Sequence, residues 1–231
     1  MINIENAVTP SPEQWEAVIR GMRNPMNSWN KSDSEFEYVT YNNELEIYDA
    51  TPIVHIGDDD MTLMEKLAEA GTDHRKYLRM IPVHMDITAP LYWWKEYDTY
   101  KVGTVANSCS TMHKIHSKAL ALSDFSYDQL IPASIARLMN TINDINDYRE
   151  IYLNWDNEPE AVKKEFDFEK ETVWYQMIQL LPSSYNQRRT VFLNYEVLRN
   201  MYKSRKNHKL HEWRDFCRKI EQLPYSQLIT G

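Results

Sequence analysis

The stretch from Ala89 to His113 constrains the fold of this chain most strongly, because it joins an aromatic segment of helical character to a run of small and polar residues. Pro90 suits the first turn of a helix, where no backbone N–H is needed. The apolar residues that follow have helical spacing, and the three aromatic residues at Tyr92–Trp94 are typical of a buried core. The polar run around Gly103 is harder to place in a core. Hydroxyl and amide side chains beside a glycine favour close approach to an anionic ligand.

Composition limits the class of protein. The 231 residues suffice for one large domain or two small ones, and five glycines against fifteen tyrosines favour helices over a barrel of short strands. The net charge of −8 argues against a general nucleic-acid binder, whose affinity comes from neutralised phosphates. No apolar run approaches the roughly 20 residues of a membrane helix, and the N-terminus does not resemble a secretory signal. Cys109 and Cys217 form no metal-binding spacing, so we expect a cytoplasmic protein.

The N-terminal half contains two expected helices. Residues 11–14 read Ser-Pro-Glu-Gln, which is the pattern of a capping box with proline at the first helical position, and the apolar stripe within Trp15–Met22 follows it. Thr62 and Glu65 form a second pattern of this kind, and Gly71 marks the end of that helix.

Two features lie between these helices. Apolar residues alternate around Asn42-Asn43, which predicts a β-hairpin. The alternating residues are Phe36, Tyr38, Leu45 and Ile47. Asp58–Asp60 is an acidic triplet that could hold a metal ion, but adjacent carboxylates more often form the solvated start of a helix. We therefore expect no metal site.

Further along, Tyr77–Ile87 alternates like a strand, and Pro82 would place it at a sheet edge or a bulge. Two long helices should follow. The first would bury Ile135, Leu138, Met139, Ile142 and Ile145, and the second Val173, Trp174, Met177, Ile178 and Leu181. Pro182 would stop the second helix. Since no repeat and no long linker divides the chain, we expect one domain over residues 1–231.

The segment Leu180–Phe216 is basic within an acidic chain. Its charged members are Arg188, Arg189, Arg199, Lys203, Arg205, Lys206, His208 and Lys209. Such a local reversal suits a phosphate-bearing ligand, because arginine offers a planar fork to phosphate oxygens. The alternative is a solvated helical surface that pairs with acidic segments. A helix from about Asn194 would carry Leu198, Met201 and Arg205 on one face, and the next helix would bury Leu210, Trp213, Cys217 and Ile220.

Two regions of the chain together resemble the flavin-dependent thymidylate synthases, FAD enzymes that methylate deoxyuridylate with methylenetetrahydrofolate and a nicotinamide reductant. That family has an Ala-Pro before a helix and then the signature R-H-R-x-x-S-x-N-E-x-S-x-R. From Ala89-Pro90 without a gap, Thr99-Tyr100-Lys101 falls on R-H-R and Thr104 on the following Ser. One inserted residue then aligns the remaining positions. Asn107 falls on the Asn, Ser108 on the Glu, Ser110 on the second Ser and Met112 on the final Arg.

The C-terminal part resembles the same family more closely. The family reads L-P-x-x-x-x-x-R, then N-x-R-S-L-x-N-F-x-x-x-R, then a helix with a tryptophan. Leu181-Pro182 and Arg188 match the first part. The second part is matched at the same spacing by Asn194, Leu198, Asn200 and Arg205, with Glu196 where the family has Arg. The closing LPYSQLI also resembles the family's ending, so the likeness reaches most of the chain.

The resemblance implies roles for particular residues. Substrate contacts would come from Glu96, Ser108, Ser110, Gln187, Arg188 and Arg205, with Ser110 and Arg205 acting in catalysis. Flavin contacts would come from Thr99, Tyr100, Lys101, Asn107, Asn194, Asn200 and His208. Arg188 and Arg205 would clamp the nucleotide phosphate and lower the energy of a uracil anion. Reduced FAD would supply hydride, with NADPH and methylenetetrahydrofolate as co-substrates and without a cysteine nucleophile.

The resemblance also implies one α/β (α+β) domain, an antiparallel sheet with long helices, assembled as a homotetramer with active sites between subunits. Because Asn200 lies well off the line from Asn194 to Arg205, one subunit would have trouble enclosing a ligand with both. Three functions stay open. The chain is a divergent thymidylate synthase or a relative acting on another pyrimidine nucleotide, a non-catalytic nucleotide- or flavin-binding protein, or a structural oligomer.

Overall fold

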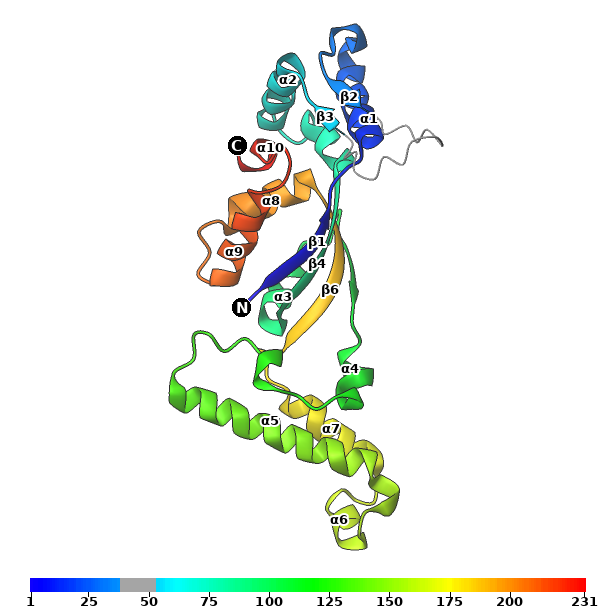
Figure 1. Ribbon diagram of the computed structural model, residues 1–231, viewed down its shortest axis with the longest axis vertical. Helices are drawn as coiled ribbons and strands as arrows, with labels where there is room; N and C mark the ends of the chain where they lie inside the picture. The colour runs from blue at the N-terminus through cyan, green and yellow to red at the C-terminus, as the bar shows by residue number, and fades with distance from the viewer. Residues whose placement is uncertain (38–52) are drawn as a thin grey trace, which may run out of the picture. The chain divides into compact units, whose positions relative to one another are not determined.

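The computed structural model describes residues 1–37 and 53–231 (Figure 1). Its helices and strands follow in this order: β1 (Asn3–Val8), α1 (Pro12–Arg23), β2 (Glu35–Glu37), β3 (Ile53–His55), α2 (Asp58–Glu69), β4 (Pro82–Pro90), α3 (Leu91–Tyr97), β5 (Val105–Ser108), α4 (Thr111–Lys114), α5 (Pro132–Leu153), α6 (Glu160–Glu165), α7 (Lys170–Leu180), β6 (Asn186–Asn194), α8 (Tyr195–Arg205), α9 (His211–Ile220) and α10 (Gln227–Thr230). The predicted class, an antiparallel sheet with long helices, is confirmed.

The strands form two sheets. One has the order β1-β4-β6-β5, and the other pairs β2 with β3 antiparallel, Phe36 opposite Val54. The hairpin turn predicted at Asn42-Asn43 lies outside the described residues, as do Tyr38, Leu45 and Ile47.

The strand predicted at Tyr77–Ile87 is correct only in its second half. Arg75–Met80 forms a 3-10 helix, and β4 begins at Pro82. Pro82 does not mark a sheet edge, since β4 lies between two neighbours. As the first residue of the strand, a proline is tolerated there because few ladder bonds are lost. The strand β6 was not predicted, because its basic first half hides the alternation of its buried residues Val191 and Leu193.

The described chain divides into two compact units, and the single-domain organisation stays a prediction. Unit 1 comprises Met1–Asn3, Ile87–Thr99 and Asn107–Arg189. Unit 2 comprises Ile4–Asp86, Tyr100–Ala106 and Thr190–Gly231.

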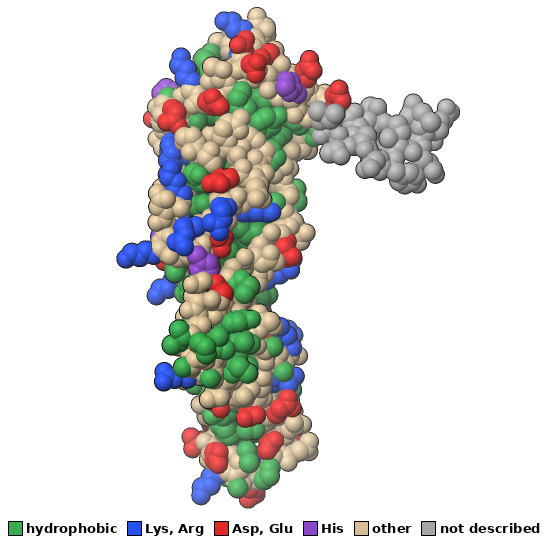
Figure 2. All heavy atoms as spheres, turned by 60° about the vertical axis from the view of Figure 1, so that its left-hand side comes forward, with side chains coloured by type: hydrophobic (Ala, Val, Ile, Leu, Met, Phe, Trp, Pro, Cys, Tyr) green, Lys and Arg blue, Asp and Glu red, His purple; other side chains and the backbone are tan. Residues whose placement is uncertain are grey.

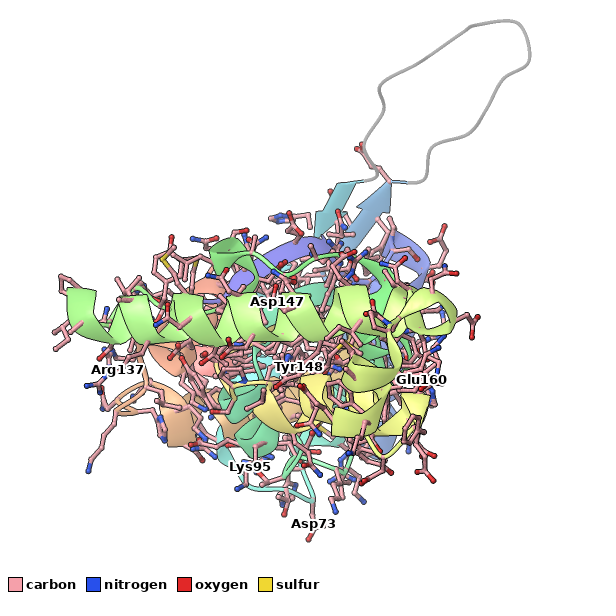
Figure 3. All side chains as sticks on the ribbon, turned by 90° about the horizontal axis from the view of Figure 1, so that it is seen from below. Asp73, Lys95, Arg137, Asp147, Tyr148 and Glu160 are labelled. Carbon is pink, nitrogen blue, oxygen red and sulfur yellow. The ribbon has the colours of Figure 1, made fainter. Side chains whose placement is uncertain are left out.

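The core of unit 1 forms where α5 and α7 run side by side (Figures 1 and 3). Leu138, Ile142 and Ile145 of α5 are buried together with Met177 of α7, as their spacing predicts. Met139 was wrongly predicted to be buried, because it lies one position past Leu138 and is 48% exposed. Figure 3 labels two adjacent residues of α5, half-buried Tyr148 and exposed Asp147.

The helix α3 supplies a second apolar cluster in unit 1. Trp93, Trp94 and Tyr97 are buried, which confirms that the aromatic run is core. The Trp93 and Trp94 ring centroids lie 4.9 Å apart, and those of Trp94 and Tyr97 lie 5.0 Å apart, both edge to face. Burial raises the pKa of the Tyr97 phenol, so it stays neutral.

In unit 2, α1 has the predicted capping box, in which the Ser11 hydroxyl accepts from the Gln14 backbone and the Gln14 side chain accepts from Ser11. The helix α2 begins at Asp58 with Gly57 as its N-cap, so the capping box predicted at Thr62 is wrong. Gly71 follows the end of α2 with φ +111°, a conformation that favours glycine.

The acidic triplet at the start of α2 is solvated only in part. Asp58 and Asp59 are exposed, but Asp60 is fully buried. Its carboxylate accepts a hydrogen bond of 2.5 Å from Nε of Arg23 and bonds of 2.6 Å from the hydroxyls of Ser32 and Ser34. Asp60 is therefore a structural anchor between α1 and α2.

Two charged side chains of α8 face inward and bind it to the rest of unit 2. Arg199 is almost fully buried and donates to the Leu228 carbonyl, 2.9 Å away, and to the Glu69 carboxylate. Glu196 accepts from Arg75, 3.3 Å away, and from Arg79. Burial by itself would raise the pKa of Glu196, but these hydrogen bonds and charges outweigh it and lower the pKa below the usual 4.5.

Three basic residues of the segment Leu180–Phe216, Lys203, Lys206 and Lys209, are exposed on or just after α8, and Arg218 is exposed on α9. Figure 2 shows Lys and Arg side chains gathered on this face. Within residues 1–37 and 53–231, no helix is both long and apolar enough to cross a membrane.

Candidate functional site

The predicted site residues fall into two groups, one in each unit. In unit 2 they are Tyr100, Lys101, Asn194, Asn200, Arg205 and His208. In unit 1 they are Glu96, Thr99, Asn107, Ser108, Ser110, Gln187 and Arg188.

The unit 2 group is centred on Arg205 at the C-terminal end of α8. Its Nε donates to the Tyr100 hydroxyl at 2.9 Å. Its guanidinium carbon lies 4.8 Å from the centroid of the Trp213 ring and 5.6 Å from that of the Tyr100 ring. Cation–π contacts of this kind contribute about 0.5–2 kcal/mol each. Arg205 is therefore half-buried and held in one orientation rather than loose on the surface.

Trp213 joins Arg205 to His208. Trp213 is fully buried in α9, and its ring lies 6.1 Å from the Tyr100 ring and 6.4 Å from the His208 ring. The Leu210 backbone N–H donates to Nδ1 of His208 at 3.2 Å, so this nitrogen acts as an acceptor. The sequence predicted Trp213 only as core. A tryptophan within a basic segment is the signal that could have indicated its contact with an arginine.

Asn194 is the N-cap of α8. Its Oδ1 accepts from the Val197 backbone N–H at 3.0 Å, and the residue is only 6% exposed. Gly103, with φ +77°, packs so closely that a Cβ there would lie 2.9 Å from the Asn194 Nδ2. This side chain is therefore committed to the helix start and to the Gly103 turn. Asn200, by contrast, is exposed on α8, and Lys101 is exposed beside Gly103.

The unit 1 group is organised by Gln187 on β6. Its Nε2 donates to the Cys109 carbonyl at 3.1 Å and to the Thr111 hydroxyl at 3.0 Å. Its Oε1 accepts from Nε of Arg189 at 3.0 Å. Both ends of the amide are thus used inside the protein, and Gln187 is 9% exposed.

Arg189 was not predicted as a site residue, yet its side chain is fixed by contacts within unit 1. Its guanidinium carbon lies 4.2 Å from the centroid of the Trp94 ring, and Nη1 donates to Asp98 at 2.7 Å. With its bond to Gln187, this arginine links α3 to the segment after β5. The alternation of β6 was the missing signal, since Gln187 and Arg189 share one face and Arg188 lies on the other.

The remaining unit 1 candidates lie at the surface. Asn107, Ser108 and Ser110 are exposed on or just after the edge strand β5, and Arg188 is exposed on β6. The Cys109 backbone N–H donates to the Arg188 carbonyl at 3.0 Å, which places this loop beside β6. Near the end of α3, the Thr99 hydroxyl donates to the carbonyl of half-buried Glu96 at 2.7 Å.

Comparisons with known proteins bear on the fold. The sequence matches no family model and no curated protein. The structure is similar to the crystal structure of flavin dependent thymidylate synthase ThyX from Helicobacter pylori complexed with FAD and dUMP, with a TM-score of 0.60 and 14% identity over 99% of this chain and 97% of that chain. A second structure of that enzyme with FAD and dUMP gives 0.59 and 14% over 99% and 95%. At this identity the likeness shows the fold alone.

Proposed function

We propose that this protein is a flavin-dependent thymidylate synthase-like enzyme that binds FAD and a pyrimidine nucleotide such as dUMP. The observation that carries the proposal is the shared fold, which extends over 99% of the chain and agrees with the sequence resemblance. Two neighbours of known structure are complexed with FAD and dUMP. The reaction would be reductive transfer of a one-carbon unit from methylenetetrahydrofolate to dUMP or a related pyrimidine nucleotide, with NADPH as reductant.

The donors in unit 2 fit a flavin. The Tyr100 ring gives an aromatic face, the exposed Lys101 ammonium suits a diphosphate, and the exposed Asn200 amide can both donate and accept. When bound, FAD would supply hydride. Asn194 would contribute by fixing the start of α8 and the turn at Gly103, because its oxygen is already bonded to Val197.

Arg205 would stabilise negative charge on the nucleotide. A guanidinium held against two rings keeps its orientation as charge develops, which is the requirement for electrostatic stabilisation. In unit 1, the Ser110 hydroxyl would donate to the nucleotide, and Gln187 would hold the adjoining segment through Cys109 and Thr111. We further propose a cytoplasmic homotetramer with shared active sites.

A second candidate, a nucleotide- or flavin-binding protein without catalysis, is favoured by one observation. Thr99, Ser108 and Met112 stand where the family signature has two arginines and a glutamate, so charge at these positions is lost. Where both FAD and the nucleotide bind, turnover distinguishes the two candidates.

The visible spectrum of the purified protein tests the proposal. We expect flavin absorption, either as isolated or after titration with FAD, followed by formation of dTMP from dUMP when methylenetetrahydrofolate and NADPH are added. A protein that takes up FAD and dUMP but forms no dTMP would establish the second candidate. A colourless protein that takes up no FAD would contradict the enzyme, and one that binds neither FAD nor dUMP would contradict both candidates.

A further inference from the structure

Unit 1 contains a pocket of about 210 Å³ beside Ser110. The residues that line it are Cys109, Ser110, Thr111, Lys114, Ile115, Ser117, Lys118, Leu120 and Tyr185. This set includes two cations and three aliphatic hydroxyls, and it contains no carboxylate. The volume is below the 300 Å³ or so at which pockets begin to hold whole small molecules, and it suits a single anionic group.

One wall of the pocket is fixed before any ligand arrives. Gln187 holds Cys109 through its carbonyl and Thr111 through its hydroxyl, and Arg189 in turn fixes the Gln187 amide. The segment that carries Ser110 is therefore held on both sides. A pocket whose wall is already ordered loses little conformational entropy when it binds.

The positive charge of the pocket comes mainly from Lys114. Lys118 is already paired with Asp124, 2.7 Å away. Lys114 makes no ion pair with any residue in the described ranges, and the Ser117 hydroxyl donates to its backbone carbonyl at 2.7 Å. Burial raises the pKa of the Tyr185 phenol, which keeps a neutral hydrogen-bond donor in the lining.

We propose that this pocket binds the phosphate monoester of the nucleotide, and that Lys114 is the cation that recognises it. The identity of the nucleotide rests on the proposed function, but the pocket does not. Arg188 is not among the lining residues and lies exposed on β6. Met112, which stands where the family signature ends in arginine, does not line the pocket either. Lys114 supplies the charge two residues further on.

The reactivity of Cys109 can report whether this pocket is occupied. Cys109 lines it and is exposed, whereas Cys217 is buried and its pKa is raised to about 11 by that burial. Because the thiolate is the reactive form, a thiol reagent should label Cys109 far faster than Cys217. Occupation of the pocket should then slow the labelling of Cys109.

The experiment follows Cys109 labelling in the full chain with dUMP, deoxyuridine or inorganic phosphate present. We expect dUMP and inorganic phosphate to protect Cys109 and deoxyuridine to leave it unprotected. In Lys114→Met, the concentration of dUMP that gives half protection should rise roughly ten- to hundredfold, the loss of one charged hydrogen bond. Lys95→Met is the matched control, since Lys95 is exposed on α3 and lies outside the pocket (Figure 3).

The outcomes separate this inference from the proposed function. If calorimetry shows that dUMP binds while Cys109 labelling is unchanged, or if deoxyuridine protects as well as dUMP, the phosphate pocket is contradicted and the proposed function stands. If inorganic phosphate protects Cys109 through Lys114 while neither dUMP nor FAD binds, the pocket is supported and the proposed function fails. Equal protection in Lys114→Met and wild type would remove Lys114 from the site.

Discussion

The two groups of candidate residues are held in place in different ways. In unit 2, Arg205 lies against Trp213 and Tyr100, and the helix that carries it begins at a buried asparagine cap. In unit 1, the exposed segment that bears Ser110 depends on the side chain of Gln187, with Arg189 behind it. The position of a residue on a helix follows from its spacing in the sequence. The position of a surface segment depends instead on side chains from other parts of the chain.

The largest effect should come from the ring that holds Arg205. Trp213→Ala removes a fully buried indole, and we expect the free energy of unfolding to fall by about 3–5 kcal/mol. Denaturant titration measures this. Trp29→Ala is the control, because Trp29 is half exposed and should lose far less. Similar losses in the two variants would mean that the unit 2 group is no more firmly built than the surface.

The pH dependence of stability probes the charges that anchor α8. Because the pKa of Glu196 is lower in the folded chain than its usual 4.5, folding favours the ionised carboxylate. Its contribution is complete above about pH 4.5 and is lost as the pH falls through the folded pKa. Glu196→Gln should cost about 1.5–3 kcal/mol at pH 7, the range for hydrogen bonds to charged groups. Unfolding curves from pH 7 to 3 should show this difference shrinking. A difference that grows in acid would contradict the assignment.

Loss of the hydrogen bonds between Gln187 and the Ser110 segment should lower the free energy of unfolding by a smaller amount. Gln187→Ala leaves the Thr111 hydroxyl and the Cys109 carbonyl without this donor, so we expect a loss of about 1–3 kcal/mol. The more specific readout is affinity for dUMP, which should fall because Gln187 holds the segment that carries Ser110. Arg188→Ala should leave stability within about 0.5 kcal/mol, since Arg188 is exposed. Unchanged dUMP affinity in Gln187→Ala would show that the segment carrying Ser110 does not depend on Gln187 for its position.

The smallest expected effect distinguishes Asn194, the helix cap, from Asn200, the proposed flavin contact. Asn194→Ala should lower stability by about 1 kcal/mol, the usual value for an N-cap. Asn200→Ala should leave stability unchanged and weaken FAD binding, because Asn200 is exposed. Thermal unfolding and FAD titration of both variants test this. A loss of stability in Asn200→Ala without one in Asn194→Ala would contradict the assignment of Asn194 as the helix cap and Asn200 as the flavin contact.

Much of the fold was predictable because its signals are local. The capping box at Ser11, the aromatic run of α3 and the apolar faces of α5 and α9 depend on spacing within one element. The central strand β6 was not, since its first half is polar and the buried residues Val191 and Leu193 alternate only in its second half. Asp60 was misjudged because its partner Arg23 is 37 residues away in sequence.

In the candidate site, too, local spacing was predictable and contacts between distant parts of the sequence were not. The spacing from Asn194 to Arg205 gave the residues of α8, but only the structure assigns Asn194 to the helix cap and brings Trp213 to Arg205. Arg189 was named only as a member of the basic segment and not as a site residue, because its neighbour Arg188 matched the family spacing. Strand alternation, once β6 was recognised, would have shown which of the two faces Gln187.

Calorimetric titration of dUMP into FAD-loaded wild type, Arg205→Ala and Arg205→Lys tests the central claim most directly. Lysine keeps the charge but not the planar fork that lies against Trp213 and Tyr100. We predict that affinity falls roughly ten- to hundredfold in Arg205→Ala and that lysine restores only part of it. Equal affinity in all three proteins, or no binding of dUMP by the wild type, would contradict the claim that this fold holds a nucleotide through Arg205.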